Sequence, residues 1–139
     1  MSIVQTQTTS FKKELYTAVH NLATDTIYIA LYTANADLNA DTTVYSATNE
    51  VPNTGTYAAG GQALTGVQIS SSGYVAYANW DDVVWTAALT ARCALIYNVT
   101  QGNKSIAVLD FGSDKTSTTT FTITMPANTS TTALIRSSN

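Results

Sequence analysis

From Asp25 onward the chain consists of short runs of β-branched and aromatic residues, separated by Gly, Asn, Asp and Pro. This pattern is typical of an all-β sandwich or barrel. We therefore expect an all-β fold, with strands at Ile27–Ala34, Val44–Val51, Gln62–Ser70, Tyr74–Trp80, Val83–Ala87, Ala91–Val99, Ser105–Phe111, Thr119–Met125 and Thr132–Arg136.

Two of these runs also predict which faces of their strands are buried. In Thr119–Met125, threonine alternates with Phe, Ile and Met, so this strand should have one wet face and one buried face. In Ala91–Val99, apolar side chains occupy both sets of alternate positions. This strand is expected to be central and covered on both faces.

The longest connections lie at Ala34–Thr43 and Pro52–Gly61, which are rich in Asp, Asn, Gly and Pro and lack an apolar period. Both are predicted to be surface loops. Eight or so strands with long loops at their ends suit a two-sheet sandwich that is jelly-roll-like, with Greek-key connections. No fixed-period repeat indicates a solenoid or propeller.

Before these strands, Ser10–Leu22 places apolar residues at spacings of three and four, which predicts one amphipathic helix with Ser10 as its N-cap. Met1–Thr9 is a polar arm with Ile3 and Val4 at its tip, and nothing in it could pack locally. We therefore expect an N-terminal arm at residues 1–9 and a single sandwich domain at residues 10–139. The arm supplies the candidate partner-binding residues Ser2, Ile3, Val4, Gln5 and Thr6.

The composition of the 139 residues limits the classes of partner that we expect this protein to bind. Hydrophobic residues make up 45%, enough for one core, whereas charged residues make up only 11% against a typical value of roughly 25%. Six basic residues argue against a nucleic-acid partner. No apolar run is long enough to span a bilayer, and Met1–Ser10 lacks the apolar region of a signal peptide, so a soluble protein made in a cytoplasm is expected. Weak charge repulsion favours a homo-oligomer or a larger assembly.

Residues that often carry chemistry stand alone in this chain. His20 is the only histidine and Cys93 the only cysteine, so neither a catalytic triad, a disulfide nor a zinc site can be assembled around them from the sequence. Asp37, Asn39 and Asp41 open like an EF-hand calcium loop, but Thr48 stands where the closing Glu belongs. We predict no enzyme activity, no metal and no cofactor.

Two further groups have plain structural explanations. Asp81 and Asp82 are adjacent, and a turn between two strands explains them more simply than a pair of catalytic carboxylates. The aromatic residues of this region suggest a carbohydrate platform, but aromatic clusters more often fill cores. The aromatic set is Tyr74, Tyr77, Trp80 and Trp85.

Four segments carry a resemblance to a known family. They read LYTANADLNADTTVYSATNEVPNTGTYAAGGQALTG, LTARCALIYN, VLDFG and FTITMPANTSTTALIR. The chain after residue 10 resembles small virion structural proteins of tailed phages, and the motifs are structural rather than catalytic. Jelly-roll proteins of this size in that group act as capsid decoration or cement proteins.

The resemblance implies a protein of the virion that bridges major capsid protein subunits on the outside of the shell. Its partner surface is expected to be the N-terminal arm together with loops, with the sandwich as a rigid support. The alternatives are a tail, collar or baseplate component, or a receptor- or glycan-binding module at the tail tip.

Overall fold

The computed structural model describes residues 2–138 and consists mainly of antiparallel strands, with one short helix. The elements in chain order are β1 Thr6–Gln7, α1 Thr9–Leu15, β2 Ile27–Tyr32, β3 Gln62–Ala63, β4 Gln68–Ser72, β5 Val75–Asn79, β6 Val83–Trp85, β7 Thr90–Asn98, β8 Lys104–Thr116, β9 Phe121–Ile123 and β10 Ile135–Ser137. The all-β sandwich predicted from the sequence is confirmed.

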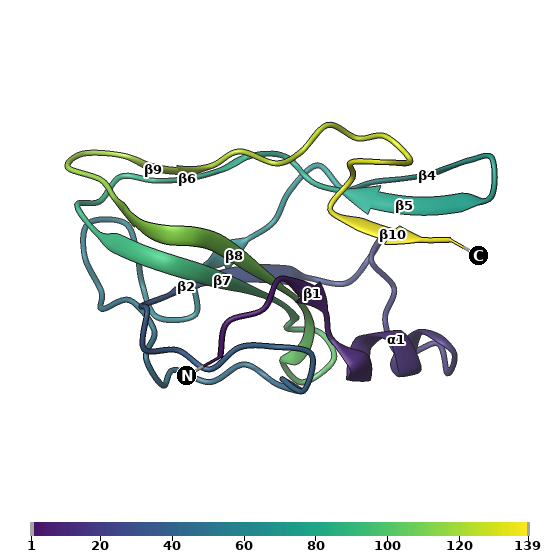
Figure 1. Cartoon of the computed structure of the whole chain (residues 1–139), viewed down its shortest axis with the longest axis horizontal. Coiled ribbons are helices and arrows are strands. Elements are labelled where there is room, and N and C mark those ends of the chain that lie inside the picture. The colour runs from purple at the N-terminus through teal and green to yellow at the C-terminus, as the bar shows by residue number, and fades with distance from the viewer. Residues whose placement is uncertain (1, 139) are drawn as a thin grey trace.

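One layer of the sandwich is a continuous sheet, and the other is divided into two parts. One layer is a five-stranded sheet in the order β1-β8-β7-β2-β3. The other consists of two separate ribbons, β6-β9 and β10-β5-β4, which lie along the top of the view in Figure 1. The β4–β5 hairpin extends beyond the five-stranded sheet at one end of the molecule. The jelly-roll connectivity is not confirmed, because this division into five, two and three strands does not form two matched sheets.

The middle strands of the five-stranded sheet, β2 and β7, are buried on both faces. Ile29, Leu31 and Ile96 belong to the main core between the two layers. Alternate residues of the same strands, among them Leu95 and Cys93, belong to a second cluster on the opposite face. The prediction that the strand within Ala91–Val99 is central and covered on both faces is therefore confirmed.

The cover of that second face is the irregular segment 33–61, which contributes Ala36 and Leu38 to the second cluster. The predicted strand at Val44–Val51 is wrong. Its two ends make isolated bridges to different strands, Val44 to Lys104 and Glu50 to Tyr32. The segment crosses from the start of β8 to the end of β2, so it cannot run along either one as a strand.

Two other predicted strands differ most from the observed limits. Gln62–Ser70 divides into β3 and β4, which belong to different sheets. Ser105–Phe111 continues to Thr116, because the Gly-Ser-Asp sequence after Phe111 forms a bulge instead of a turn. The strand resumes beyond the bulge, where Lys115 pairs with Ala91.

The helix is shorter than predicted, and both of its ends have local causes. At its start, Thr8 rather than Ser10 is the N-cap, and its Oγ1 accepts a hydrogen bond from Phe11 N at 3.3 Å. At its end, Val19 N donates to Glu14 O and Ala18 N to Leu15 O, with Ala18 at φ 59°. This is a Schellman motif, which stops the helix before Val19 although the apolar spacing continues to Leu22.

The expectation of a free N-terminal arm is corrected by the structure, which describes the arm from residue 2. Thr6 pairs with Val108 and Gln7 with Ala107, so β1 is an edge strand of the main sheet. Ile3 makes a parallel bridge to Leu38 and packs against the second cluster. The partners of this segment lie far along the chain, and the sequence of the segment alone gives no sign of them.

Ala18→Gly is expected to stabilise the protein by about 1 kcal/mol, because Ala18 holds a left-handed backbone conformation that glycine adopts without strain. The measurement is the free energy of unfolding in urea. The matched control is Ala88→Gly, an exposed residue outside the left-handed region, which should lose a few tenths of a kcal/mol. Equal changes in the two variants would contradict this explanation of the helix end.

Deletion of residues 2–7 is expected to destabilise the fold by roughly 2–4 kcal/mol, because it removes the β1–β8 pairing, the backbone bonds to Leu38 and the contact of Ile3. Thermal melting followed by circular dichroism measures the loss. Tyr16→Ala, at a side chain that is 91% exposed, is the control and should melt like the wild type. An unchanged melting temperature for the deletion would show that the segment contributes nothing to stability.

Candidate functional site

A groove of about 600 Å³ lies at one edge of the sandwich, between β8 of the main sheet and β9 of the opposing ribbon. The groove forms because the two layers of the sandwich are not joined to each other at this edge. Within residues 2–138, β1 pairs with β8 only at Val108 and Ala107, and β9 pairs only with β6. The second half of β8 and one side of β9 are therefore unpaired edges that flank the groove.

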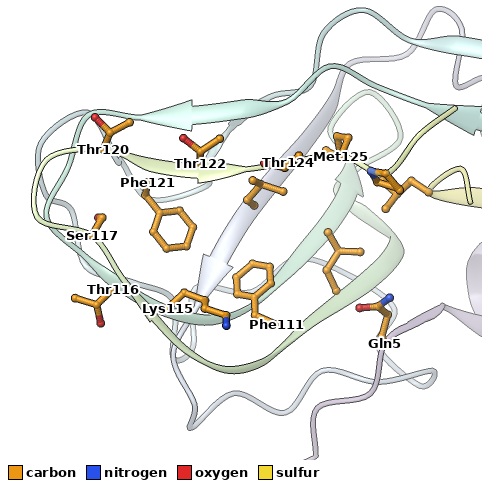
Figure 2. Close-up of a pocket in the computed structure, with 14 residues that line it drawn as sticks. Gln5, Phe111, Lys115, Thr116, Ser117, Thr120, Phe121, Thr122, Thr124 and Met125 are labelled. Carbon is orange, nitrogen blue, oxygen red and sulfur yellow. The ribbon is translucent and has the colours of Figure 1, made fainter.

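Apolar side chains from both layers line the floor of this groove. Phe111 from β8 and Phe121 from β9 point toward each other in Figure 2, with ring centroids 6.3 Å apart. Phe121 in turn contacts Trp85, which contacts Tyr57, so the aromatic contacts run from the core to the groove. The other apolar lining residues are Leu109, Ile123, Met125, Pro126 and Leu134.

The rim of the groove is polar and almost uncharged. Thr120 and Thr122 lie on the side of β9 away from Phe121, and Gln5 lies at the opposite end (Figure 2). Gln5 Oε1 accepts a hydrogen bond from Asp110 N at 3.1 Å. This side-chain bond takes the place of one backbone bond that a neighbouring strand would make to the open edge of β8. Lys115 is the single charged residue among those that line the groove.

This arrangement suits binding. The lining has aromatic and aliphatic surface, hydroxyl groups and one lysine, with no carboxylate, imidazole or thiol for acid–base or nucleophilic chemistry. Unpaired strand edges offer backbone N–H and C=O groups to an added strand, while an adjacent apolar groove takes up its alternate side chains. An extended peptide segment is the ligand that uses both features.

His20 lies elsewhere and is occupied by structural contacts. Its side chain is fully buried, and Nδ1 accepts a hydrogen bond from Asn98 Nδ2 at 3.0 Å, because an amide nitrogen only donates. Nε2 therefore carries the proton and donates to Glu14 Oε1 at 2.8 Å. Asn98 also bonds Asp25 and Gln101, which fixes the orientation of its amide. The set ties the turn after α1 to the end of β7.

The other residues considered for chemistry are similarly occupied. Burial raises the pKa of the Cys93 thiol to about 12, helped by nearby Asp110, so it stays protonated at neutral pH. Asp37 Oδ1 accepts hydrogen bonds from Ser2 N and from Asn39 Nδ2, and Asn39 Oδ1 accepts from Asp41 N. Within residues 2–138, no group of three or more His, Cys, Asp or Glu side chains is arranged around a common metal position.

The remaining carboxylate and aromatic candidates lie in different parts of the fold. Asp82 Oδ1 accepts a hydrogen bond from Met125 N at 2.7 Å, which links the start of β6 to the end of β9. Trp80 and Trp85 are 5% and 1% exposed, so they cannot form a platform for a sugar. Tyr74 is exposed at the tip of the β4–β5 hairpin.

Four tyrosines surround Glu50 where segment 33–61 meets the main sheet. Tyr32 and Tyr97 belong to the second cluster, whereas Tyr57 belongs to the main core. Glu50 Oε1 accepts a hydrogen bond from Tyr45 OH, and Oε2 accepts from Tyr57 OH and Gly60 N, both at 2.7 Å. Burial and the Glu50 carboxylate raise the pKa of Tyr45 to about 12. Burial also raises the pKa values of the surrounding Tyr32, Tyr57 and Tyr97. These phenols are neutral at physiological pH and hold segment 33–61 in place.

The predicted partner-binding residues do not line one site. Ser2 and Ile3 lie against Leu38 on the second face, and Val4 is 48% exposed. Gln5 reaches the end of the groove, and Thr6 lies in β1. Their role in partner binding stays a prediction. Sequence reasoning identified the buried side of the strand within Thr119–Met125, but it could not show that β8 and β9 leave a groove between them, because pairing of distant strands decides this.

Comparisons of the chain with protein-family models, with curated proteins and with solved structures found no match. Among residues 2–138, no helix is long and apolar enough to cross a membrane.

Stability is expected to fall as the pH rises from about 10 toward 12. An unfolded tyrosine ionises near its ordinary pKa of 10.0, whereas folded Tyr45 keeps its proton to about 12, so its contribution is complete below pH 10 and is lost above it. Tyr45→Phe should make this decline shallower, as measured by urea unfolding at a series of pH values. Val44→Ala, which removes no titratable group, is the control and should keep the wild-type slope. Identical slopes for Tyr45→Phe and wild type would contradict the prediction.

Proposed function

We propose that this chain is a non-enzymatic structural protein of a phage virion that works by binding another protein chain, as a capsid decoration or cement protein. The observation that carries the binding role is the apolar groove between the unpaired edges of β8 and β9. The virion setting rests on the resemblance of the segments Leu31–Gly66, Leu89–Asn98, Val108–Gly112 and Phe121–Arg136 to small phage structural proteins.

The chemistry of the groove defines its partner. An extended segment of a major capsid protein or another virion protein would add a strand to β8 and place alternate apolar side chains against Phe111 and Phe121. A neutral or acidic residue of that segment would lie beside Lys115. One such contact is modest, but copies repeated by the symmetry of a shell bind together through effective concentration.

Phe111→Ser should weaken partner binding about tenfold or more, because it removes an aromatic ring from the groove floor. The matched control is Val84→Ser on β6, where Val84 is 50% exposed and does not line the groove. Incorporation of each purified variant into particles that lack the chain is measured by quantitative gel analysis. Thermal melting accompanies it, so that only folded protein is compared. Equal incorporation of the two variants would show that the groove is not the docking site.

The position on the particle is tested by gold labelling of a tagged chain on intact virions. Labels distributed over the head support the decoration role. Labels confined to one end of the tail would replace it with the tail, baseplate or receptor-binding alternative. Particles without labels would refute the virion assignment itself.

A further inference from the structure

The edge strand β4 offers a second interaction surface, on the hairpin that extends beyond the main sheet (Figure 1). Within residues 2–138, β4 pairs with β5 alone, and all five residues of Gln68–Ser72 are exposed. Gly73 at φ 59° occupies the first central position of the two-residue loop to Val75, as a type II′ turn requires. The hairpin is therefore well formed, and its outer edge is open.

The directions of the backbone groups follow from this turn. Ser72 and Val75 flank a two-residue loop and form a hydrogen-bonded pair, so pairing alternates along the strand. Ser70 and Gln68 bond inward to β5, while the N–H and C=O groups of Ile69 and Ser71 point outward. Two donors and two acceptors are thus available along five residues.

The edge lacks the features that usually prevent strands from pairing with each other. Charged side chains, proline and bulges protect exposed edges in natural proteins. From Val67 to Trp80 the sequence contains none of Asp, Glu, Lys, Arg or Pro. By contrast, β8 carries a bulge with Asp114 and Lys115 beside it, features that disfavour pairing of this edge with the same edge of a second copy. The outer edge of β6 is covered by Gln62, whose Nε2 donates to Val84 O at 2.8 Å.

We propose that β4 pairs with β4 of a second copy of this chain, antiparallel and around a two-fold axis at Ser70. A second copy is the occupant that this edge fits, because an uncharged edge meets no like-charge repulsion from itself and its outward groups are self-complementary. In this register Ile69 of each copy pairs with Ser71 of the other, and all four outward groups form hydrogen bonds. The two three-stranded ribbons become one six-stranded sheet.

The same register buries apolar surface. Ile69 is 55% exposed and lies on the side of the hairpin that faces α1, where Ala78, Leu15 and Leu22 line a hollow. The two Ile69 side chains of the dimer are diagonal neighbours on this face. The contact is independent of the groove between β8 and β9 and does not rest on the proposed function.

A cysteine cross-link tests the register directly. Across the two-fold axis, Ser70 of one copy faces Ser70 of the other as a non-hydrogen-bonded pair with Cα atoms about 4.5 Å apart, which suits a disulfide. Ser70→Cys is therefore expected to form a covalent dimer under mild oxidation. Ser72→Cys is the matched control, since its counterpart is displaced by roughly 13 Å along the strand. The native Cys93 is fully buried and should not interfere.

Sedimentation velocity tests the dimer without a cross-link, at protein concentrations up to about 1 mM, to cover weak association. Wild type is expected to form dimers, and Ser71→Pro, which removes an outward N–H, to be monomeric. Ile69→Lys should also be monomeric through like-charge repulsion, which covers the case that proline unfolds the hairpin. Val84→Lys, a similarly exposed strand position, should still dimerise. A monomeric wild type, equal cross-linking at positions 70 and 72, or dimers of Ile69→Lys would overturn the proposal.

Discussion

The burial of β7 on both faces is the constraint on which the rest of the fold depends. Every residue of β7 from Cys93 to Asn98 is buried, and apolar side chains point both ways. A strand of this kind needs two covers, because each uncovered face would leave several apolar side chains in water. The ribbons of the sandwich supply one cover. The chain supplies the other from segment 33–61, which has too little regular structure to form a third layer.

An irregular cover must be held by side chains and single backbone contacts, and Glu50 provides the main attachment. Its carboxylate accepts hydrogen bonds from Tyr45 OH, Tyr57 OH and Gly60 N. The Tyr57 hydroxyl also accepts a hydrogen bond from Leu31 N in β2 at 2.8 Å. Gly61 at φ 82° brings the segment against β2, where a Cβ would lie 1.7 Å from Ile29 O. These tyrosines have displaced pKa values for a structural reason, and the groove that suits a ligand lies elsewhere.

The sequence predicted the elements whose burial pattern is local. Alternation within Thr119–Met125 and the two-sided apolar pattern of Ala91–Val99 both correspond to observed strands. It failed where distant contacts decide. Val44–Val51 has a strand-like composition, yet its two ends form isolated bridges to different strands, β8 and β2. Ser2–Gln7 lacks apolar periodicity, yet β8 provides it with a partner. The groove depends on where β1 stops along β8, a property that no single segment encodes.

The open edges of β8 and β4 differ in the kind of partner strand that they favour. The edge of β8 adjoins an apolar groove with Lys115 beside it, so an added strand is chosen by its alternate side chains as well as its backbone. The edge of β4 has backbone groups, Gln68, serines and Ile69 but no charged side chain, so geometry alone favours a partner with the same pattern. In a chain with 11% charged residues, electrostatic steering contributes little to either contact. Specificity must then come from register and shape, which requires rigid edges, and pairing with the buried strand β7 supports the β8 edge in this way.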